Sequence, residues 1–173
     1  MVAKIRDEAI KYNFNILIEG TFRTIETPKK ELKNFRLKGY HSEIVICTCP
    51  KELSWESTRL RAKELEEAGL QPRYVPQEIH DFVVDNLGEN VKKIFDLGLV
   101  SRLEIYSRSG KLFDSEFDDA KNIENIINSE IHSEVLSKMT QQFKSTNQVA
   151  KNKIAEHTAS INKVQGEYRS IKQ

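Results

Sequence analysis

A carboxylate followed by a glycine ends one apolar segment of this chain. Residues 15–24 read Asn-Ile-Leu-Ile-Glu-Gly-Thr-Phe-Arg-Thr, so Glu19, Thr21 and Arg23 follow a run that is typical of a buried strand. In open parallel sheets, ligands bind in the crevice outside the carboxyl ends of the strands. The three polar side chains are therefore candidates to face a ligand. A Glu at a strand end also often only accepts backbone hydrogen bonds, and the spacing alone favours the two interpretations equally.

Arginines in two neighbouring segments form the second candidate. The sequence Ser-Thr-Arg-Leu-Arg ends at Arg61, and Arg73 follows twelve residues later. Guanidinium groups bind phosphoryl oxygens bidentately and stay charged while a phosphoryl group transfers, so two of them on a helix and loop suit a γ-phosphate. In a chain with 31% charged residues, arginines on a helix face are more often solvated or paired, here with Glu64 or Glu67. By themselves, the arginines favour this second interpretation.

Two further pairs carry weaker chemical signals. His80 and Asp81 resemble an acid–base pair, but adjacent residues of a helix do not face each other, so a role on the helix surface or at a cap is predicted. Cys47 and Cys49 lie two residues apart in a strand pattern, and no second Cys or His pair follows at zinc-finger spacing. The sequence therefore predicts structural cysteines rather than a metal site.

Three short apolar runs must position these side chains. They cover residues 14–18, 44–47 and 103–106, are rich in Ile and Val, and alternate with longer stretches of helical periodicity. This alternation predicts β/α units, a parallel sheet and the α/β fold class. The run at residues 14–18 is predicted to be the central strand.

Helices are predicted from their start and stop signals. The first has Thr27 as its N-cap, Pro28 in its first turn and Gly39 as its stop. The second covers about residues 50–68 and ends at a glycine. The third follows an apolar stripe over residues 79–95. These helices are expected to flank the sheet.

The composition changes near residue 118. Residues 1–117 are predicted to form the α/β domain, and in residues 118–173 Asn, Gln, Ser and Lys replace the aromatic residues. From residue 136 onward, apolar residues alternate in steps of four and three, which predicts a polar helical extension that packs on another helix. A solvated basic tail is the alternative interpretation of the same segment.

Charge and hydropathy exclude several classes of partner. The chain has 27 Lys and Arg against 26 Asp and Glu, which gives no reason to expect nucleic acid as a partner. No apolar run approaches the roughly 20 residues that span a bilayer, so no membrane partner is expected. Two cysteines without disulfide spacing suit a reducing compartment, and we expect a cytoplasmic protein.

Taken together, the motifs over roughly residues 12–115 resemble the zeta toxin family in order and nearly in spacing. They are Ile16-Leu17-Ile18-Glu19-Gly20-Thr21-Phe22-Arg23-Thr24, Pro28-Lys29-Lys30, Lys38-Gly39-Tyr40, Pro50-Lys51-Glu52-Leu53-Ser54, Ser57-Thr58 with Arg61, Arg73 with Pro76, His80-Asp81 and Ile105-Tyr106-Ser107-Arg108. The resemblance implies a P-loop-kinase-like fold and a toxin of an epsilon/zeta toxin–antitoxin module. Such toxins phosphorylate UDP-N-acetylglucosamine with ATP.

The resemblance also implies roles for individual residues. Glu19 corresponds to the acid at the end of the central strand, near the reacting phosphate and in indirect contact with Mg²⁺. Arg61 and Arg73 correspond to the two lid arginines that contact ATP and stabilise the transferred phosphoryl group. Thr21 and Arg23 correspond to the edge of the sugar-nucleotide pocket. The implied cofactors are ATP and Mg²⁺, and the implied partners are UDP-N-acetylglucosamine and an epsilon-type antitoxin.

The chain departs from the family pattern where ATP binds. In the family, a strand, a Walker-type loop and a catalytic aspartate precede the segment matched by Tyr12, and none of them is present in this sequence. We therefore expect an incomplete sheet and a truncated or split kinase that is inactive alone. A complementary N-terminal chain or self-association would cover the open sheet. The alternative is a non-catalytic binding or interaction module derived from the same fold.

Overall fold

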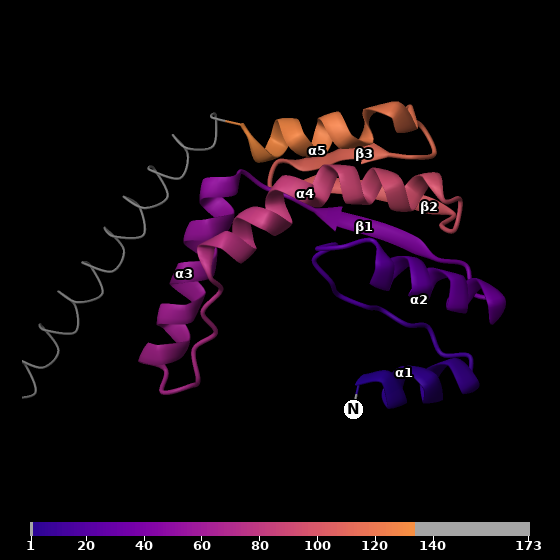
Figure 1. Ribbon diagram of the computed structural model, residues 1–173, viewed down its shortest axis with the longest axis horizontal. Helices are drawn as coiled ribbons and strands as arrows, with labels where there is room; N and C mark the ends of the chain where they lie inside the picture. The colour runs from indigo at the N-terminus through magenta and orange to yellow at the C-terminus, as the bar shows by residue number, and fades with distance from the viewer. Residues whose placement is uncertain (1, 134–173) are drawn as a thin grey trace, which may run out of the picture. The chain divides into compact units, whose positions relative to one another are not determined.

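The computed structural model describes residues 2–133, which lie in one compact unit. The predicted helical seam from residue 136 onward lies outside the described residues. The unit combines helices with a small sheet (Figure 1). Its elements, in chain order, are α1 (Val2–Lys11), α2 (Glu26–Leu37), β1 (Glu43–Cys47), α3 (Lys51–Glu67), α4 (Gln77–Asp96), β2 (Arg102–Ser107), β3 (Gly110–Asp114), the 3-10 turn η1 (Ala120–Asn122) and α5 (Ile123–Ile131).

The sheet has the order β1-β2-β3. Strands β1 and β2 are parallel, with Ile44 opposite Leu103 and Ile46 opposite Ile105, as the alternation of runs and helices predicts. Strand β3 is antiparallel to β2, which makes the sheet mixed rather than purely parallel. The sequence analysis missed β3 because its five residues Gly-Lys-Leu-Phe-Asp hold only two apolar side chains and follow β2 after a short turn. The α/β class is confirmed.

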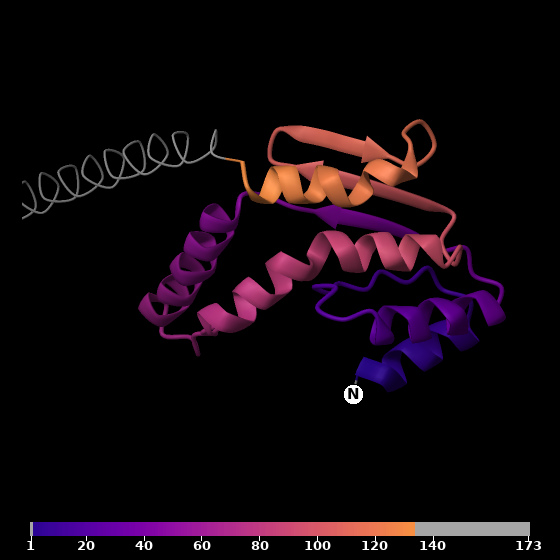
Figure 2. The same cartoon turned by 45° about the horizontal axis from the view of Figure 1, so that its top comes forward.

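The core lies on one face of the sheet. Helices α4 and α5 lie on the same side of the strands in Figures 1 and 2, and α2 lies beside β1. Burial of each large apolar side chain contributes about 1.5–3 kcal/mol. The buried residues are Leu32, Ile44, Ile46, Val91, Ile94, Leu103, Ile105, Phe113, Ile123, Ile127 and Ile131.

Helix α5 belongs to this core. Its three isoleucines, Ile123, Ile127 and Ile131, recur every fourth residue and therefore line one face of the helix, which is buried. The compact unit accordingly continues to Ser133. The division of the chain into residues 1–117 and 118–173 stays a prediction, but the first residues of the proposed extension pack with the sheet.

The predicted central strand is wrong. Residues 14–18 form no strand, and Leu17 is 91% exposed. A strand requires a neighbour that accepts and donates its ladder hydrogen bonds. Within residues 2–133, β1 pairs with β2 alone, and no strand lies beside residues 14–18. Residues 14–18 thus have a strand-like sequence, but no strand among the described residues pairs with them.

The predicted end of α2 agrees with the structure, but its predicted start does not. Gly39 has a φ of +81°, which is the left-handed conformation that stops a helix, as predicted for the end of α2. The assignment of Thr27 as N-cap is wrong, because α2 starts at Glu26 and Ile25 occupies the cap position without a side-chain hydrogen bond. Helices α3 and α4 cover the predicted segments within a few residues.

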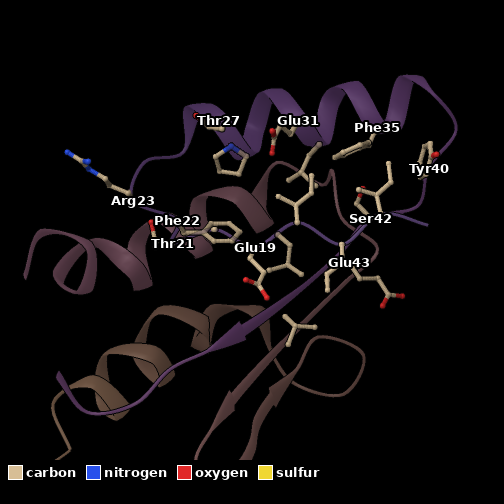
Figure 3. A pocket seen from close by; sticks show the side chains of 18 of the residues that line it. Glu19, Thr21, Phe22, Arg23, Thr27, Glu31, Phe35, Tyr40, Ser42 and Glu43 are labelled. Carbon is tan, nitrogen blue, oxygen red and sulfur yellow. The ribbon is translucent and has the colours of Figure 1, made fainter. Parts of the chain in front are cut away.

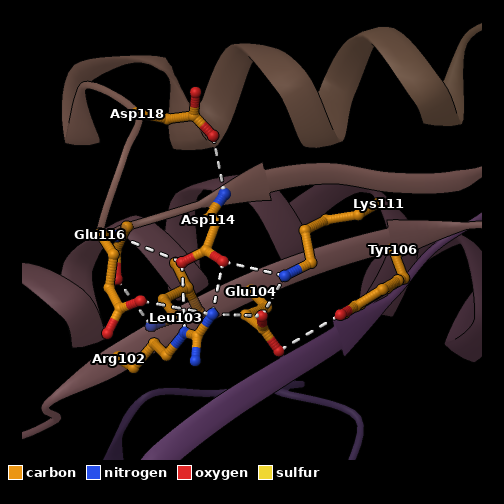
Figure 4. Close-up of polar contacts among 9 residues, drawn as sticks. Arg102, Leu103, Glu104, Tyr106, Lys111, Asp114, Glu116 and Asp118 are labelled. Atoms are coloured by element: carbon orange, nitrogen blue, oxygen red, sulfur yellow. Dashed lines mark hydrogen bonds and ion pairs between the residues drawn. The ribbon is translucent and has the colours of Figure 1, made fainter.

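An ion network joins β2 to β3 (Figure 4). The Asp114 carboxylate accepts hydrogen bonds from Arg102 at 2.6 and 3.2 Å and from Lys111 at 2.9 Å, and Lys111 also pairs with Glu104. The hydrogen bonds from Arg102, followed by those from Lys111, hold the pKa of Asp114 well below its usual range. The network therefore favours the ionised carboxylate in the folded protein.

Among residues 2–133, no helix combines the length and the hydropathy that a membrane span requires.

Candidate functional site

A cavity of about 630 Å³ lies between residues 16–24, helix α2 and the chain that enters β1. This volume is in the range of small-molecule sites. Glu19, Thr21 and Arg23 all line it, so the structure brings these three predicted residues together. In Figure 3 the Glu19 carboxylate lies on the β1 side of the segment, and the Arg23 guanidinium points away from the other labelled side chains. Two further carboxylates, Glu31 and Glu43, line the same cavity.

Asn90 of helix α4 holds the end of this segment. Its side-chain nitrogen donates hydrogen bonds to the carbonyl oxygens of Phe22 at 2.9 Å and Arg23 at 3.2 Å. Asn90 is only 9% exposed, so these bonds supply partners that the buried amide needs. Phe22 has a φ of +50°, which is uncommon for a residue with a Cβ. The amide of Asn90 thus fixes the unusual turn that presents Thr21 and Arg23.

The sequence analysis missed Asn90, although a signal was present. Asn90 falls on the apolar stripe predicted for residues 79–95, three residues after Leu87 and four before Ile94. A polar residue at a core position of a helix needs a buried hydrogen-bond partner. Its partners are backbone carbonyls 67 and 68 residues away in the chain, which the helix pattern does not identify.

Other contacts fix the two ends of the segment. The Arg23 guanidinium lies over the Phe82 ring of α4, 5.9 Å from its centroid, in a cation–π arrangement. The Tyr40 hydroxyl donates a hydrogen bond to the carbonyl oxygen of Phe14 at 3.1 Å. Arg6 of α1 pairs with Glu31 at 2.7 Å, which joins α1 to the α2 wall of the cavity.

The other two predicted residues lie elsewhere. Arg61 is on α3 and Arg73 is on the connection between α3 and α4, and neither lines the cavity. Both are exposed, and within residues 2–133 neither makes an ion pair or a hydrogen bond. The interpretation that Arg61 pairs with Glu64 or Glu67 is not borne out among these residues, where Glu67 pairs with Lys63. Both guanidinium groups therefore stay available to solvent or to a ligand.

His80 packs helix α4 against α3. Its side chain is buried, its Nε2 lies 3.1 Å from the Ser54 hydroxyl, and its ring lies 5.3 Å from that of Trp55. The Asp81 carboxylate lies 3.5 Å from the His80 Nδ1 and pairs with Lys51 at 3.2 Å. The prediction of a surface or capping role is wrong for His80, because the stripe of α4 faces α3 at this position. The pair is structural and does not face the cavity.

The cysteines are not arranged as a metal site. Cys47 and Cys49 are both free thiols. Burial, the largest cause, raises the pKa of the Cys49 thiol, which favours the protonated form over a metal-binding thiolate. No group of three or more His, Cys, Asp or Glu residues within the described part of the chain is placed to hold a metal ion.

The sequence and the fold have counterparts in a known protein family. Residues 1–118 match the family model described as Zeta toxin, and the chain belongs to the zeta toxin family. Toxin PezT of Streptococcus pneumoniae serotype 4 is 37% identical over 109 residues, which cover 62% of this chain and 43% of PezT. Toxin zeta of Streptococcus pyogenes is 30% identical over 117 residues, which cover 66% of this chain and 39% of that toxin. The chain thus spans about two fifths of the length of these relatives.

A solved structure has the same fold. A chain from the PezAT chromosomal toxin–antitoxin system of Streptococcus pneumoniae superposes with a TM-score of 0.65 and 25% sequence identity. The match covers 86% of this chain and 62% of the solved one. The predicted family and the predicted fold class are therefore both confirmed. Both the sequence relatives and the solved structure contain residues with no counterpart in the matched region.

Proposed function

We propose that this chain supplies the acceptor-binding part of a zeta-toxin-type kinase, which transfers a phosphoryl group from ATP to UDP-N-acetylglucosamine. The observation that carries the proposal is a cavity that Glu19, Thr21 and Arg23 line together, beside a turn held by Asn90. These are the residues that the family resemblance assigns to the acid and to the edge of the sugar-nucleotide pocket. The chain belongs to the zeta toxin family. Three of the predicted site residues, Glu19, Thr21 and Arg23, line the same cavity.

Each side chain suits a part of this ligand. The Arg23 guanidinium lies at the outer end of the cavity beside the Phe82 ring and suits the diphosphate of a ligand that extends out of the cavity. The Thr21 hydroxyl can donate to or accept from a sugar hydroxyl. The Glu19 carboxylate lies at the β1 side of the cavity and suits a role near the reacting hydroxyl. Arg61 and Arg73 are free to stabilise phosphoryl charge from outside the cavity.

ATP and Mg²⁺ do not fit a site made by the described residues alone. Residues 1–173 contain no G-x-x-x-x-G-K-[ST] sequence to cradle the phosphates, and the described residues hold no cluster of three metal-ligating side chains. The proposal therefore assigns ATP binding and the general base to residues outside these 173. The isolated chain is expected to phosphorylate nothing. An epsilon-type antitoxin is the proposed regulatory partner.

A non-catalytic binding module is the second candidate. It is favoured by the position of Arg61 and Arg73 outside the cavity and by the missing phosphate loop. The two candidates differ in whether the cavity retains affinity for the sugar nucleotide and whether activity returns when the missing residues are supplied.

Titration calorimetry of the purified chain with UDP-N-acetylglucosamine tests the acceptor site. We expect measurable binding that falls tenfold or more in Arg23→Ala, since a hydrogen bond to a charged group contributes about 1.5–3 kcal/mol. Arg59→Ala is the matched control, because Arg59 is exposed on α3 and does not line the cavity, and it should bind as the parent does. Absence of binding by a chain with a cooperative thermal transition would overturn the acceptor assignment.

A further inference from the structure

One wall of the cavity is a face of helix α2. Residues three and four apart on a helix lie on the same face, and this spacing relates the α2 residues that line the cavity. They are Thr27, Pro28, Glu31, Leu32 and Phe35. Three of these side chains are apolar, so Thr27 and Glu31 are the polar groups of the α2 wall. The proposed function gives neither of them a role.

A salt bridge from helix α1 fixes the Glu31 carboxylate. The Arg6 Nη1 donates a hydrogen bond to Oε1 of Glu31 at 2.7 Å, between residues that are 25 apart in the chain. The two side chains are only 26% and 27% exposed, so salt and water screen this pair less than a pair on the open surface. Arg6 does not line the cavity. A ligand in the cavity therefore meets the carboxylate of this pair and not its guanidinium.

The salt bridge leaves the α2 wall with hydrogen-bonding capacity for a ligand. A carboxylate has two oxygens that together accept about four hydrogen bonds. Within residues 2–133, the Glu31 carboxylate receives a hydrogen bond at Oε1 alone, so Oε2 is without a partner there. The Thr27 hydroxyl also makes no hydrogen bond to these residues and does not cap α2. The wall thus offers carboxylate oxygens as acceptors and one hydroxyl, but no cation.

The charged groups of the cavity are unevenly distributed. Its described lining includes three carboxylates, Glu19, Glu31 and Glu43, and one guanidinium, that of Arg23. Figure 3 shows Glu31 on the side of α2 that faces residues 16–24, while the Arg23 guanidinium points away from the other labelled side chains. A phosphate or carboxylate of a ligand is attracted to Arg23 and repelled by the carboxylate of the α2 wall. The anionic part of a ligand therefore belongs at the Arg23 end, and uncharged donor groups belong against α2.

We propose that Glu31 determines which sugar the site accepts and that Arg6 is its positioning residue. Glu31 accepts a hydrogen bond from a hydroxyl or amide group of an uncharged sugar, and the Thr27 hydroxyl supplies a second polar contact. The same carboxylate disfavours a sugar that carries an anionic group, because specificity is a difference of affinities and a like charge lowers one of them. This inference rests on the proposed function, because it assigns the sugar end of the nucleotide sugar to the α2 wall.

Titration calorimetry with two nucleotide sugars that differ in one charged group tests this specificity. The probes are UDP-N-acetylglucosamine and UDP-N-acetylglucosaminuronate, which carries a carboxylate in place of the sugar hydroxymethyl group. We expect the full chain to bind the uncharged sugar about tenfold or more tightly than the uronate. Glu31→Gln keeps the shape of the side chain and removes its charge, so it should reduce the ratio of the two dissociation constants to about threefold or less. Glu43→Gln is the matched control, because it removes a carboxylate from the β1 side of the same cavity and should keep the parental ratio.

Two variants of Arg6 test its positioning role. Arg6→Met removes the hydrogen bond to Glu31 and keeps an apolar side chain, so the ratio of dissociation constants should fall below the parental value. Arg6→Lys keeps a cation that can pair with Glu31 and should restore a ratio close to that of the parent. A merely structural role of Arg6 would lower the melting temperature or weaken both ligands equally, without changing the ratio. An unchanged ratio in Arg6→Met would therefore overturn the positioning role.

The results distinguish this inference from the proposed function. If the parent has a cooperative thermal transition and does not bind UDP-N-acetylglucosamine, both are overturned. If the parent binds it but binds the uronate equally well, only the specificity assignment is overturned. A parental ratio in Glu31→Gln, or the loss of both ligands by this variant, would also overturn that assignment alone. An equal fall of the ratio in Glu43→Gln would do the same, because the total charge of the cavity and not the α2 wall would then set the specificity.

Discussion

The two sides of β1 differ in how completely they are built. Toward β2, the strands pair in register and the core residues Val91, Ile94 and Leu103 are wholly buried. Toward residues 15–21, no ladder forms among the described residues, and Leu17 is almost wholly exposed. On the β2 side, the strand and its core residues find their hydrogen-bond and packing partners within residues 2–133. The open side carries the candidate site residues Glu19 and Thr21 and is held by hydrogen bonds from Tyr40 and from Asn90 of α4.

The largest expected effect separates the stabilities of the two sides. Ile94→Ala removes a wholly buried side chain from the core of α4 and should lower the free energy of unfolding by about 2–5 kcal/mol. Leu17→Ala should change it by less than about 0.5 kcal/mol, because that side chain is exposed in the chain alone. Urea denaturation followed by circular dichroism measures both. A loss of several kcal/mol in Leu17→Ala would show that the open side is already packed in solution.

A smaller loss of stability is expected at Asn90, which joins α4 of the packed side to the end of the open segment. Asn90→Ala leaves the carbonyl oxygens of Phe22 and Arg23 without their donor and should cost about 1–3 kcal/mol. It should also speed amide exchange in residues 15–23 and weaken sugar-nucleotide binding. Asn86→Ala is the control, because within residues 2–133 the Asn86 side chain bonds only to the Phe82 carbonyl of its own helix. If exchange in residues 15–23 were the same in both variants, Asn90 would not be what holds the segment.

The smallest expected effect is the pH dependence of stability that Asp114 contributes on the β2 side of the sheet. Hydrogen bonds from Arg102 and Lys111 depress the pKa of Asp114, so its contribution to stability is present above its unfolded pKa of about 3.9 and is lost as the pH falls through the lower folded pKa. The melting temperature of Asp114→Asn should be lower than that of the parent at pH 7, and the difference should narrow toward pH 2. Asp96→Asn, which removes an exposed pair with Lys92, is the control. A difference that stayed constant from pH 7 to pH 2 would contradict the role of the charged carboxylate.

Local patterns in the sequence were sufficient for several parts of this protein. The apolar stripe and the stop at Gly98 define α4, and the run at residues 103–106 defines β2, because periodicity and glycine conformation depend on near neighbours. The cluster of Glu19, Thr21 and Arg23 was also predictable, since one short segment carries all three. The motifs in these segments identified the family.

Tertiary structure decided the strand pairing and the buried polar contacts, because both depend on partners that are distant in the chain. Residues 14–18 have a strand-like sequence but no ladder, since a strand needs a neighbour that the sequence of the strand does not specify. Asn90 and His80 lie on a helix whose pattern shows them as polar residues, while only the fold shows that one holds the carbonyls of Phe22 and Arg23 and the other packs on Trp55. Hydrophobic periodicity is a property of consecutive residues, whereas hydrogen-bond partners and cavity walls are set by which segments meet in space.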